Sequence, residues 1–85
     1  MTYKYRFNEG ESREFYLAQI EGYKTVSAMK AQLTRFRKQC EEYHDDLVKA
    51  YNRPSRMLHG EIVTCGQIKD EVREICLIQE IYNSL

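Results

Sequence analysis

The stretch that decides the fold is MKAQLTRFRKQCEEYHDDLVKA, residues 29–50. Its apolar side chains recur at alternating spacings of four and three residues, the pattern of a helix that buries one continuous stripe against a partner helix. The stripe consists of Met29, Leu33, Phe36, Cys40, Tyr43, Leu47 and Ala50. Charged and polar side chains fill most of the positions between them. The pattern therefore predicts one long amphipathic helix, which we place over residues 28–52.

After this helix the chain is expected to turn back on itself. Pro54 cannot continue a helix and disfavours helical geometry at Arg53, so this point predicts a tight connection. A second apolar stripe then recurs at spacings of three and four, and it predicts a helix over residues 56–82. The stripe consists of Leu58, Ile62, Cys65, Ile68, Val72 and Ile75. Because the connection is short, the two helices should run antiparallel as a hairpin.

Two features of the second predicted helix indicate packing beyond the hairpin. Gly60 and Gly66 lie within it, and each costs about 1 kcal/mol relative to alanine, so another helix should approach closely or the helix should bend. The segment ICLI, residues 75–78, is apolar on every face, which is more apolar surface than one hairpin partner covers. The predicted fold class is therefore all-α, assembled as a homo-oligomer.

The segment before the hairpin predicts an extended arm and a short helix. Residues 1–10 begin with alternating aromatic and polar side chains, which favours an extended aromatic arm. A short helix is predicted over residues 11–21, ended by Gly22 in a left-handed conformation. Ser27 is the expected N-cap of the long helix, because its hydroxyl can accept from a free backbone N–H. These elements together make residues 1–85 a single helical-hairpin domain.

The charge balance and the cysteines limit the classes of function. Thirteen basic residues balance thirteen acidic ones, which argues against both a strongly basic nucleic-acid binder and an acidic DNA mimic. The sequence contains no apolar run of membrane-spanning length and no signal-peptide pattern, so we expect a cytoplasmic protein without membrane contact. The three cysteines lack CxxC spacing and fall on apolar stripes, where reduced and buried thiols are expected.

The sequence contains no motif of a catalytic site. It has no glycine-rich phosphate loop, no nucleophile elbow and no HExxH pattern. Cys40 and His44 are four residues apart and so are spaced to share a metal ion, but no second pair of ligands has suitable spacing. The paired carboxylates Glu41 and Glu42 fall on a solvated helix face, without the burial that tunes acidity. We therefore expect no enzymatic activity, no metal site and no cofactor.

The turn before the long helix carries the residues of a candidate anion site. Residues 22–40 include five basic residues and no acidic one. A helix start also offers free N–H groups and a partial positive charge, which together bind anions. An ammonium and two hydroxyls suit a phosphate, and a flat ring suits a nucleobase. The side chains that supply these groups are Tyr23, Lys24, Thr25 and Ser27. The alternative is that they only turn the chain, cap the helix and cover the core.

A second basic group flanks the proline turn at the other end of the hairpin. It consists of Lys49, Arg53 and Arg56. Since a helix of about 25 residues spans roughly 37 Å, this group cannot reach Lys24 within one chain. If copies associated antiparallel, however, the proline turn of one chain would approach the Tyr23–Ser27 turn of another. Arg56 would then contribute most, because a guanidinium both pairs with phosphate and stacks on bases.

The order of these motifs resembles the phage anti-CBASS cyclic-nucleotide sponges, whose hairpin domain is similar to that of anti-Thoeris sponges. The family motif I-x-G-Y-R-x-L-[ST] corresponds to IEGYKTVS, residues 20–27, with Lys24 in place of arginine and Val26 in place of leucine. The family's second hairpin helix starts near R-W-L, which corresponds to RML at residues 56–58. The motif T-x-L-Q further along is similar to TCGQ at residues 64–67.

The resemblance implies a compact all-helical protein that assembles as a hexamer in the cytoplasm of an infected bacterial host. It would sequester cyclic di- or trinucleotides without cleaving them, and so antagonise CBASS immunity. The implied pocket lies between subunits, where the turn holds phosphate, a neighbouring chain supplies an arginine, and an N-terminal aromatic ring stacks on a base. The residues carried over are Tyr23, Lys24, Thr25, Ser27 and Arg56, with Phe7 or Tyr5 as the stacking ring.

Two other classes of function were weighed against a cyclic-nucleotide sponge. A small phage-encoded protein–protein interaction module or inhibitor needs only the amphipathic hairpin and the aromatic arm. A small nucleic-acid binder would use the basic start of the long helix. The acidic second half of that helix would repel a duplex laid along it, so we expect no DNA binding.

Overall fold

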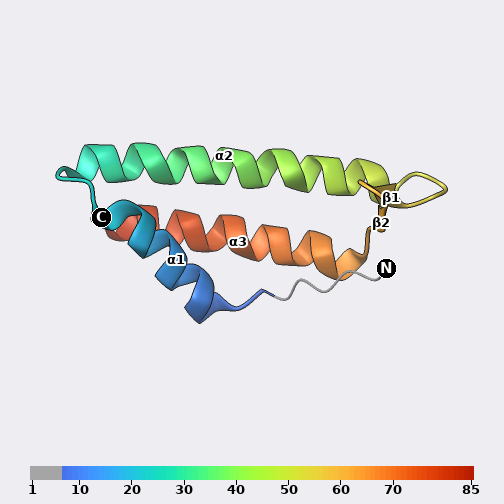
Figure 1. Ribbon diagram of the computed structural model, residues 1–85, viewed down its shortest axis with the longest axis horizontal. Coiled ribbons are helices and arrows are strands. Elements are labelled where there is room, and N and C mark those ends of the chain that lie inside the picture. The colour runs from blue at the N-terminus through green and yellow to red at the C-terminus, as the bar shows by residue number, and fades with distance from the viewer. Residues whose placement is uncertain (1–6) are drawn as a thin grey trace.

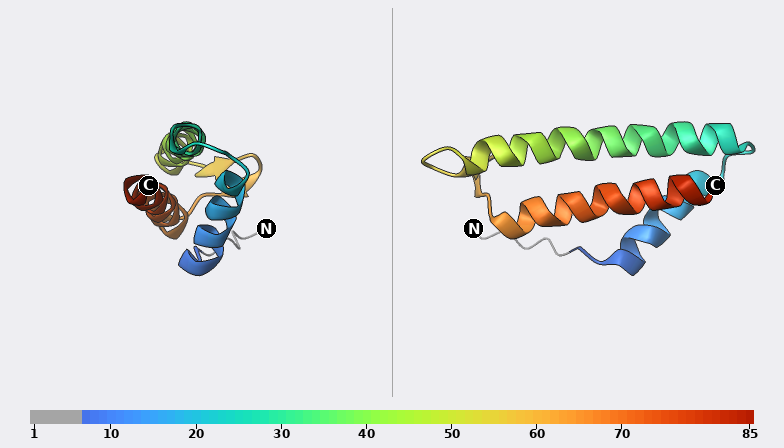
Figure 2. Two further views of the ribbon diagram at one scale, coloured as in Figure 1. Left: turned by 90° about the vertical axis from the view of Figure 1, so that its left-hand side faces the viewer. Right: turned by 180° about the vertical axis from the view of Figure 1, so that it is seen from behind.

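The computed structural model describes residues 7–85, and within them the chain is mostly helical. The three helices are α1 (Glu9–Glu21), α2 (Val26–Tyr51) and α3 (Cys65–Ser84). Figure 1 shows α2 and α3 side by side and antiparallel along the length of the molecule, which measures 47 × 20 × 18 Å. The end-on view in Figure 2 shows α1 on one side of this pair. The predicted short helix followed by a long antiparallel hairpin is confirmed.

The start of α1 differs from the prediction because Asn8 caps the helix. The Oδ1 atom of Asn8 accepts a hydrogen bond from the backbone N–H of Glu11 at 3.1 Å. Residues 9 and 10 therefore belong to the helix and not to the extended arm that was predicted over residues 1–10. Asn8 itself has the extended backbone expected of the arm, whereas residues 1–6, with Tyr5, lie outside the described part of the chain.

The connection between α1 and α2 corrects two further predictions. Gly22 ends α1 with φ −76°, so the left-handed conformation predicted for it is wrong. Thr25, and not Ser27, is the N-cap of α2: its backbone is extended and its Oγ1 accepts from the N–H of Ala28 at 3.1 Å. The helix therefore begins at Val26, and the Ser27 side chain is exposed in its first turn.

The segment after α2 is a short β-hairpin where a helix was predicted. Strand β1 (Met57–Leu58) pairs antiparallel with β2 (Glu61–Ile62). Three residues of this segment have left-handed backbones, with φ of 51° at Arg56, 53° at His59 and 81° at Gly60. An L-residue helix does not use this region, so the helix predicted over residues 56–82 is wrong in its first turns. Gly60 adopts its left-handed conformation here without the steric cost that other residues bear.

Helix α3 buries a face that only partly matches the predicted one, on which Ile68 and Ile75 are half-buried. It begins at Cys65, after the Oγ1 atom of Thr64 accepts from the N–H of Gln67 at 3.2 Å. On the predicted stripe Cys65 is exposed, and Val72 keeps 44% of its surface exposed. The buried or half-buried stripe runs instead through Gln67, Glu71, Glu74, Ile78 and Ile81. Two of these five positions are carboxylates, which a search for apolar periodicity passes over.

The core consists of two separate clusters of buried side chains. The first joins all three helices and contains Tyr16, Ile20, Leu33, Leu77, Ile78 and Ile81. The second lies near the β-hairpin and contains Leu47, Ala50 and Val63. Leu77 and Ile78 belong to the ICLI segment, and both are buried within the single chain. The protein's own helices therefore cover apolar surface from which an oligomer was predicted, and self-association stays a prediction.

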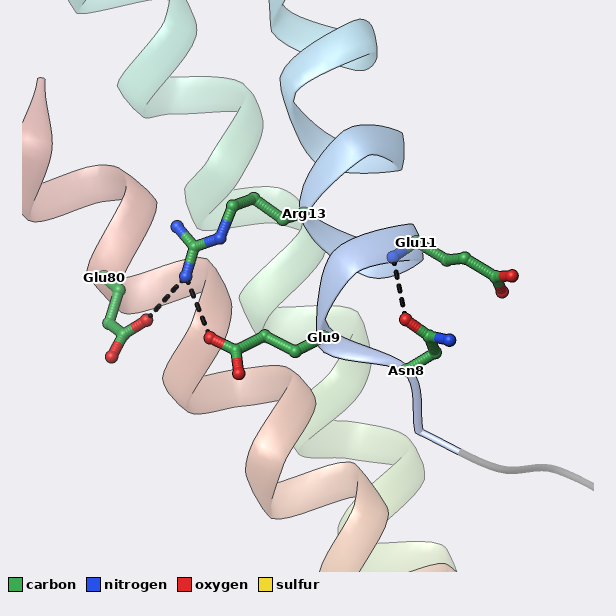
Figure 3. Close-up of polar contacts among 5 residues, drawn as sticks. All are labelled: Asn8, Glu9, Glu11, Arg13 and Glu80. Carbon is green, nitrogen blue, oxygen red and sulfur yellow. Dashed lines mark hydrogen bonds and ion pairs between the residues drawn. The ribbon is translucent and has the colours of Figure 1, made fainter.

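Helix α1 is held against α3 by an ion-pair cluster at its start (Figure 3). The Nη2 atom of Arg13 lies 3.1 Å from Glu9 Oε1 on the same helix and 3.1 Å from Glu80 Oε2 on α3. Hydrogen bonds to these two carboxylates raise the pKa of the Arg13 guanidinium. Because the two carboxylates are largely exposed and Arg13 is partly exposed, water and salt screen the cluster, and it orients α1 more than it stabilises the fold.

The cysteines only partly follow the prediction of buried, reduced thiols. All three are free, but Cys65 and Cys76 are exposed, and only Cys40 is half-buried. Burial, and then the negative charge of Glu71, raise the pKa of the Cys40 thiol to about 11. The expectation of burial is therefore wrong for two cysteines, because one lies in the first turn of α3 and the other on its outer face.

Candidate functional site

The turn predicted to bind an anion lies at the end of the molecule where α2 begins and α3 ends (Figure 1). The backbone N–H of Tyr23 donates to the carbonyl of Ile20 at 3.1 Å and closes the turn, while 37% of the Tyr23 residue surface stays exposed. Lys24, Thr25 and Ser27 are exposed as well. Four of the predicted site residues are thus together in one turn and accessible to a ligand.

The electrostatics of this turn are those of an uncompensated helix start. The first turn of α2 contains no acidic side chain, although acidic residues there would normally complement the helix dipole. Thr25 uses its hydroxyl to cap the N–H of Ala28, whereas the preceding N–H groups of the first turn have no acceptor inside an α-helix. One turn further on, the Lys30 ammonium lies 5.1 Å from the centre of the Tyr82 ring. The start of α2 therefore presents N–H donors and Lys24 to solvent, while the exposed Glu21 ends α1 three residues before Lys24.

The structure does not bring Arg56 to this turn within one chain. Arg56 follows the other end of α2, whose 26 residues span about 39 Å. Its guanidinium carbon lies 4.8 Å from the centre of the Tyr51 ring, and its backbone carbonyl accepts from the N–H of Val63 at 2.7 Å. Arg56 is exposed, so it is accessible to a second molecule but not to Lys24 of its own chain.

Neither candidate for the stacking ring, Phe7 or Tyr5, is placed at the turn by the described part of the chain. Phe7 precedes α1 and Tyr23 follows it, so the 13 residues of α1, about 20 Å, separate them. Tyr5 lies outside the described residues. Phe7 instead lines an open pocket of about 480 Å³ between the start of α1 and the outer face of α3. The pocket is lined by Phe7, Glu9, Val72, Arg73, Cys76, Leu77 and Glu80.

A polar layer that was not predicted from the sequence lies between the two core clusters. The Tyr16 hydroxyl donates to Glu74 Oε1 at 2.6 Å, and the Ser12 hydroxyl donates to Glu74 Oε2 at 3.3 Å. The sulfur of Cys40 lies 3.9 Å from the same tyrosine oxygen. Burial, and then the bond to Glu74, raise the pKa of Tyr16 above its usual range. The layer therefore ties α1, α2 and α3 together through one carboxylate.

The second part of the layer lies one to two turns nearer the β-hairpin. The Nε2 atom of Gln67 donates to the Tyr43 hydroxyl at 3.3 Å, while its buried Oε1 atom has no hydrogen-bond partner among the described residues. Between Gln67 and Glu74 lies Glu71, which is half-buried. Burial, and then the charges of Glu74 and Asp70, raise the pKa of the Glu71 carboxyl to about 7. This carboxyl therefore changes its charge near neutral pH, inside a helix–helix contact.

Within residues 7–85 no group of three or more His, Cys, Asp or Glu residues is arranged to hold a metal ion. His44, which was considered with Cys40 as a ligand pair, instead has its Nδ1 atom 3.8 Å from Asp45 Oδ1. The helices of the described part are also too short or too polar for any of them to span a membrane.

Comparison with known proteins identifies no relative of this chain. No family model, no curated protein and no solved structure matches it. The similarity to cyclic-nucleotide sponges therefore rests on the short motifs of the sequence alone, and any function must be argued from the residues and their geometry.

Proposed function

We propose that the protein binds cyclic di- or trinucleotides at the start of α2 and sequesters them without cleavage, which would antagonise CBASS immunity in the cytoplasm of an infected host. The observation that carries this proposal is the exposed start of α2, where Lys24 precedes the Thr25 cap and the first turn combines N–H donors with the Ser27 hydroxyl and contains no acidic residue. Because Thr25 already caps the helix, the hydroxyl of Ser27 is not needed for that purpose and is accessible to a ligand.

Each group of the turn matches one part of such a ligand. The N–H groups and the Ser27 hydroxyl donate to phosphate oxygens, and the Lys24 ammonium pairs with the phosphate charge. The exposed Tyr23 ring offers a face for a base. Residues 22–40 contain neither a carboxylate nor an imidazole to activate water, which favours binding over hydrolysis.

A cyclic oligonucleotide carries at least two phosphates, so its capture is expected to involve more than one chain. We propose a homo-oligomer, up to the hexamer that the resemblance implies, in which Arg56 of one chain reaches the turn of another. Two observations support a shared site: Arg56 is exposed, and it lies too far from the turn of its own chain to reach a ligand there. Neither a membrane nor DNA is part of the proposed function.

The Lys24→Ala variant tests the proposed function. A charge-assisted bond to phosphate contributes about 1.5–3 kcal/mol, so affinity for cyclic di- or trinucleotides should fall roughly ten- to hundredfold while the melting temperature stays unchanged. Calorimetric titration against a panel of cyclic dinucleotides and trinucleotides measures the affinity. Lys69→Ala removes an equally exposed lysine from α3 and serves as the control.

Three outcomes would contradict the proposal. The first is a wild type that binds no member of the panel, and the second is a Lys24→Ala variant that binds as tightly as the wild type. The third concerns chemistry: bound ligand is recovered after denaturation of the complex and analysed by mass spectrometry. Intact cyclic ligand supports sequestration, whereas a linear product identifies an enzyme.

A further inference from the structure

The middle of the outward face of α2 carries charges that change sign near Cys40. Arg35 and Lys38 come before that point, Glu42 and Asp45 come after it, and all four side chains are exposed. Farther along the same face Lys49 is basic and exposed, and its counterpart at equal distance before Cys40 is the uncharged Ala31. Lys38 and Glu42 are four residues apart and so are spaced for an ion pair on their own helix. In the described part of the chain they nevertheless make no such pair with any residue. Both charges therefore remain available to a partner.

The four charged residues are placed symmetrically along the sequence about Cys40. Lys38 and Glu42 each lie two residues from it, and Arg35 and Asp45 each lie five residues from it. In each case the two residues at equal distance have opposite charge. A helix with this pattern is complementary to a second copy of itself when the two run antiparallel, whereas a parallel copy would oppose like charges.

We propose that the outward face of α2 is a contact surface for a second copy of this chain, aligned antiparallel about position 40. A two-fold axis at that point makes every contact occur twice. Lys38 of each copy then faces the other copy's Glu42, and Arg35 faces the other copy's Asp45. The contact thus contains four ion pairs, all formed by side chains that are exposed in the single chain.

The same alignment has a consequence for the anion site. Lys24 precedes the start of α2 and Arg56 follows its end, so the antiparallel alignment has Lys24 of one copy and Arg56 of the other at the same end of the pair. The arrangement repeats at the second end. An anion bound at the turn would then have a cation of the second copy at the same end of the assembly. This consequence rests on the proposed function, whereas the contact between the two copies does not.

The strength of the contact follows from its composition. The face consists of charged and polar side chains, and an exposed ion pair contributes only about 0.2–1 kcal/mol in general. A contact along one helix is also smaller than a standard protein–protein interface. The association should therefore be weak, detectable at low ionic strength and high protein concentration, and reduced by added salt.

Charge reversal at positions 38 and 42 tests the alignment. Each single variant, Lys38→Glu or Glu42→Lys, replaces two attractive pairs by two repulsive ones, so self-association should weaken roughly tenfold or more. The variant that carries both changes restores opposite charges and should associate like the wild type. An equimolar mixture of the two single variants should form a mixed dimer, because every contact between them pairs opposite charges. Lys69→Glu makes the same charge change on α3 and is the control.

Sedimentation equilibrium of these proteins over a sodium chloride series gives the result. A wild type that stays monomeric at low salt overturns the inference, and so do single variants that associate like the wild type or a double variant that fails to recover. Cyclic-nucleotide binding is measured on the same samples. A dimer that binds no ligand contradicts only the proposed function. A monomer that binds ligand contradicts the antiparallel contact and the site shared between chains, but not ligand binding at the α2 turn.

Discussion

Replacement of Glu71 by glutamine is expected to stabilise the protein above neutral pH. The Glu71 carboxyl has its pKa raised from 4.5 to about 7, first by burial and then by the charges of Glu74 and Asp70. Across the contact on α2 it faces the half-buried Cys40 thiol, whose pKa it raises in turn. Because the folded protein holds this proton more tightly than the unfolded chain, the folded state binds more protons between pH 4.5 and about 7. Stability therefore falls as the pH rises through this window.

The magnitude follows from the size of the shift and the exposure of the side chain. A fully buried carboxyl moved from pKa 4.5 to about 7 would lose about 3.4 kcal/mol of folding free energy on ionisation. Glu71 is only half-buried, so solvent screening reduces this to about 1–2 kcal/mol. Glutamine has the same shape without the charge. Glu71→Gln should therefore be about 1–2 kcal/mol more stable than the wild type at pH 8, with little difference at pH 4.

Urea denaturation followed by circular dichroism between pH 4 and pH 9 measures this difference. The quantity of interest is the free energy of unfolding of the variant minus that of the wild type, since other titrating groups cancel in it. Glu14→Gln removes an exposed carboxylate from α1 and should show no such pH dependence. The reasoning fails if Glu71→Gln and the wild type have parallel stability curves, or if the variant loses stability above pH 7.

The remaining predictions concern the α2 cap and the thiols. Thr25→Ala should lower the free energy of unfolding by about 1 kcal/mol, whereas Ser27→Ala should change it by no more than a few tenths; equal losses in chemical denaturation would contradict the assignment of Thr25 as the cap. At pH 8, iodoacetamide should alkylate the exposed Cys65 and Cys76 well before Cys40, because the raised pKa of about 11 leaves little thiolate at Cys40. Peptide mass spectrometry over time measures the three rates, and a Cys40 rate equal to the others would show that its environment is misjudged.

The long helix could be predicted from the sequence because its burial is decided locally. Leu33, Leu47 and Ala50 recur with the period of a helix, and all three are buried. The β-hairpin could not be predicted in the same way. Leu58 and Ile62 are four residues apart, as on a helix, yet they belong to two paired strands. A spacing of four residues fits both a helix and this β-hairpin. The left-handed backbone at Gly60 and its neighbours is what makes the segment a β-hairpin.

The interior face of α3 could not be predicted because its burial depends on the other two helices. Glu74 faces inward because Tyr16, from a helix nearly 60 residues away in sequence, donates a hydrogen bond to it. Apolar periodicity favoured Val72, which the structure leaves exposed. The anion site shows the same limit: its turn was located from residue types, but the choice between Thr25 and Ser27 as cap depends on backbone geometry.

The division of the core into two clusters has a consequence for how the molecule opens. One cluster joins all three helices, and the other joins the end of α2 to the β-hairpin segment. Gln67, Glu71 and Glu74 lie between the two clusters, and these polar side chains hold α2 and α3 together less strongly than packed aliphatic side chains do. We therefore expect the two ends to open locally with different free energies, because different side chains stabilise each of them. Hydrogen exchange of the amides at the two ends would then report separate opening events along the two shared helices.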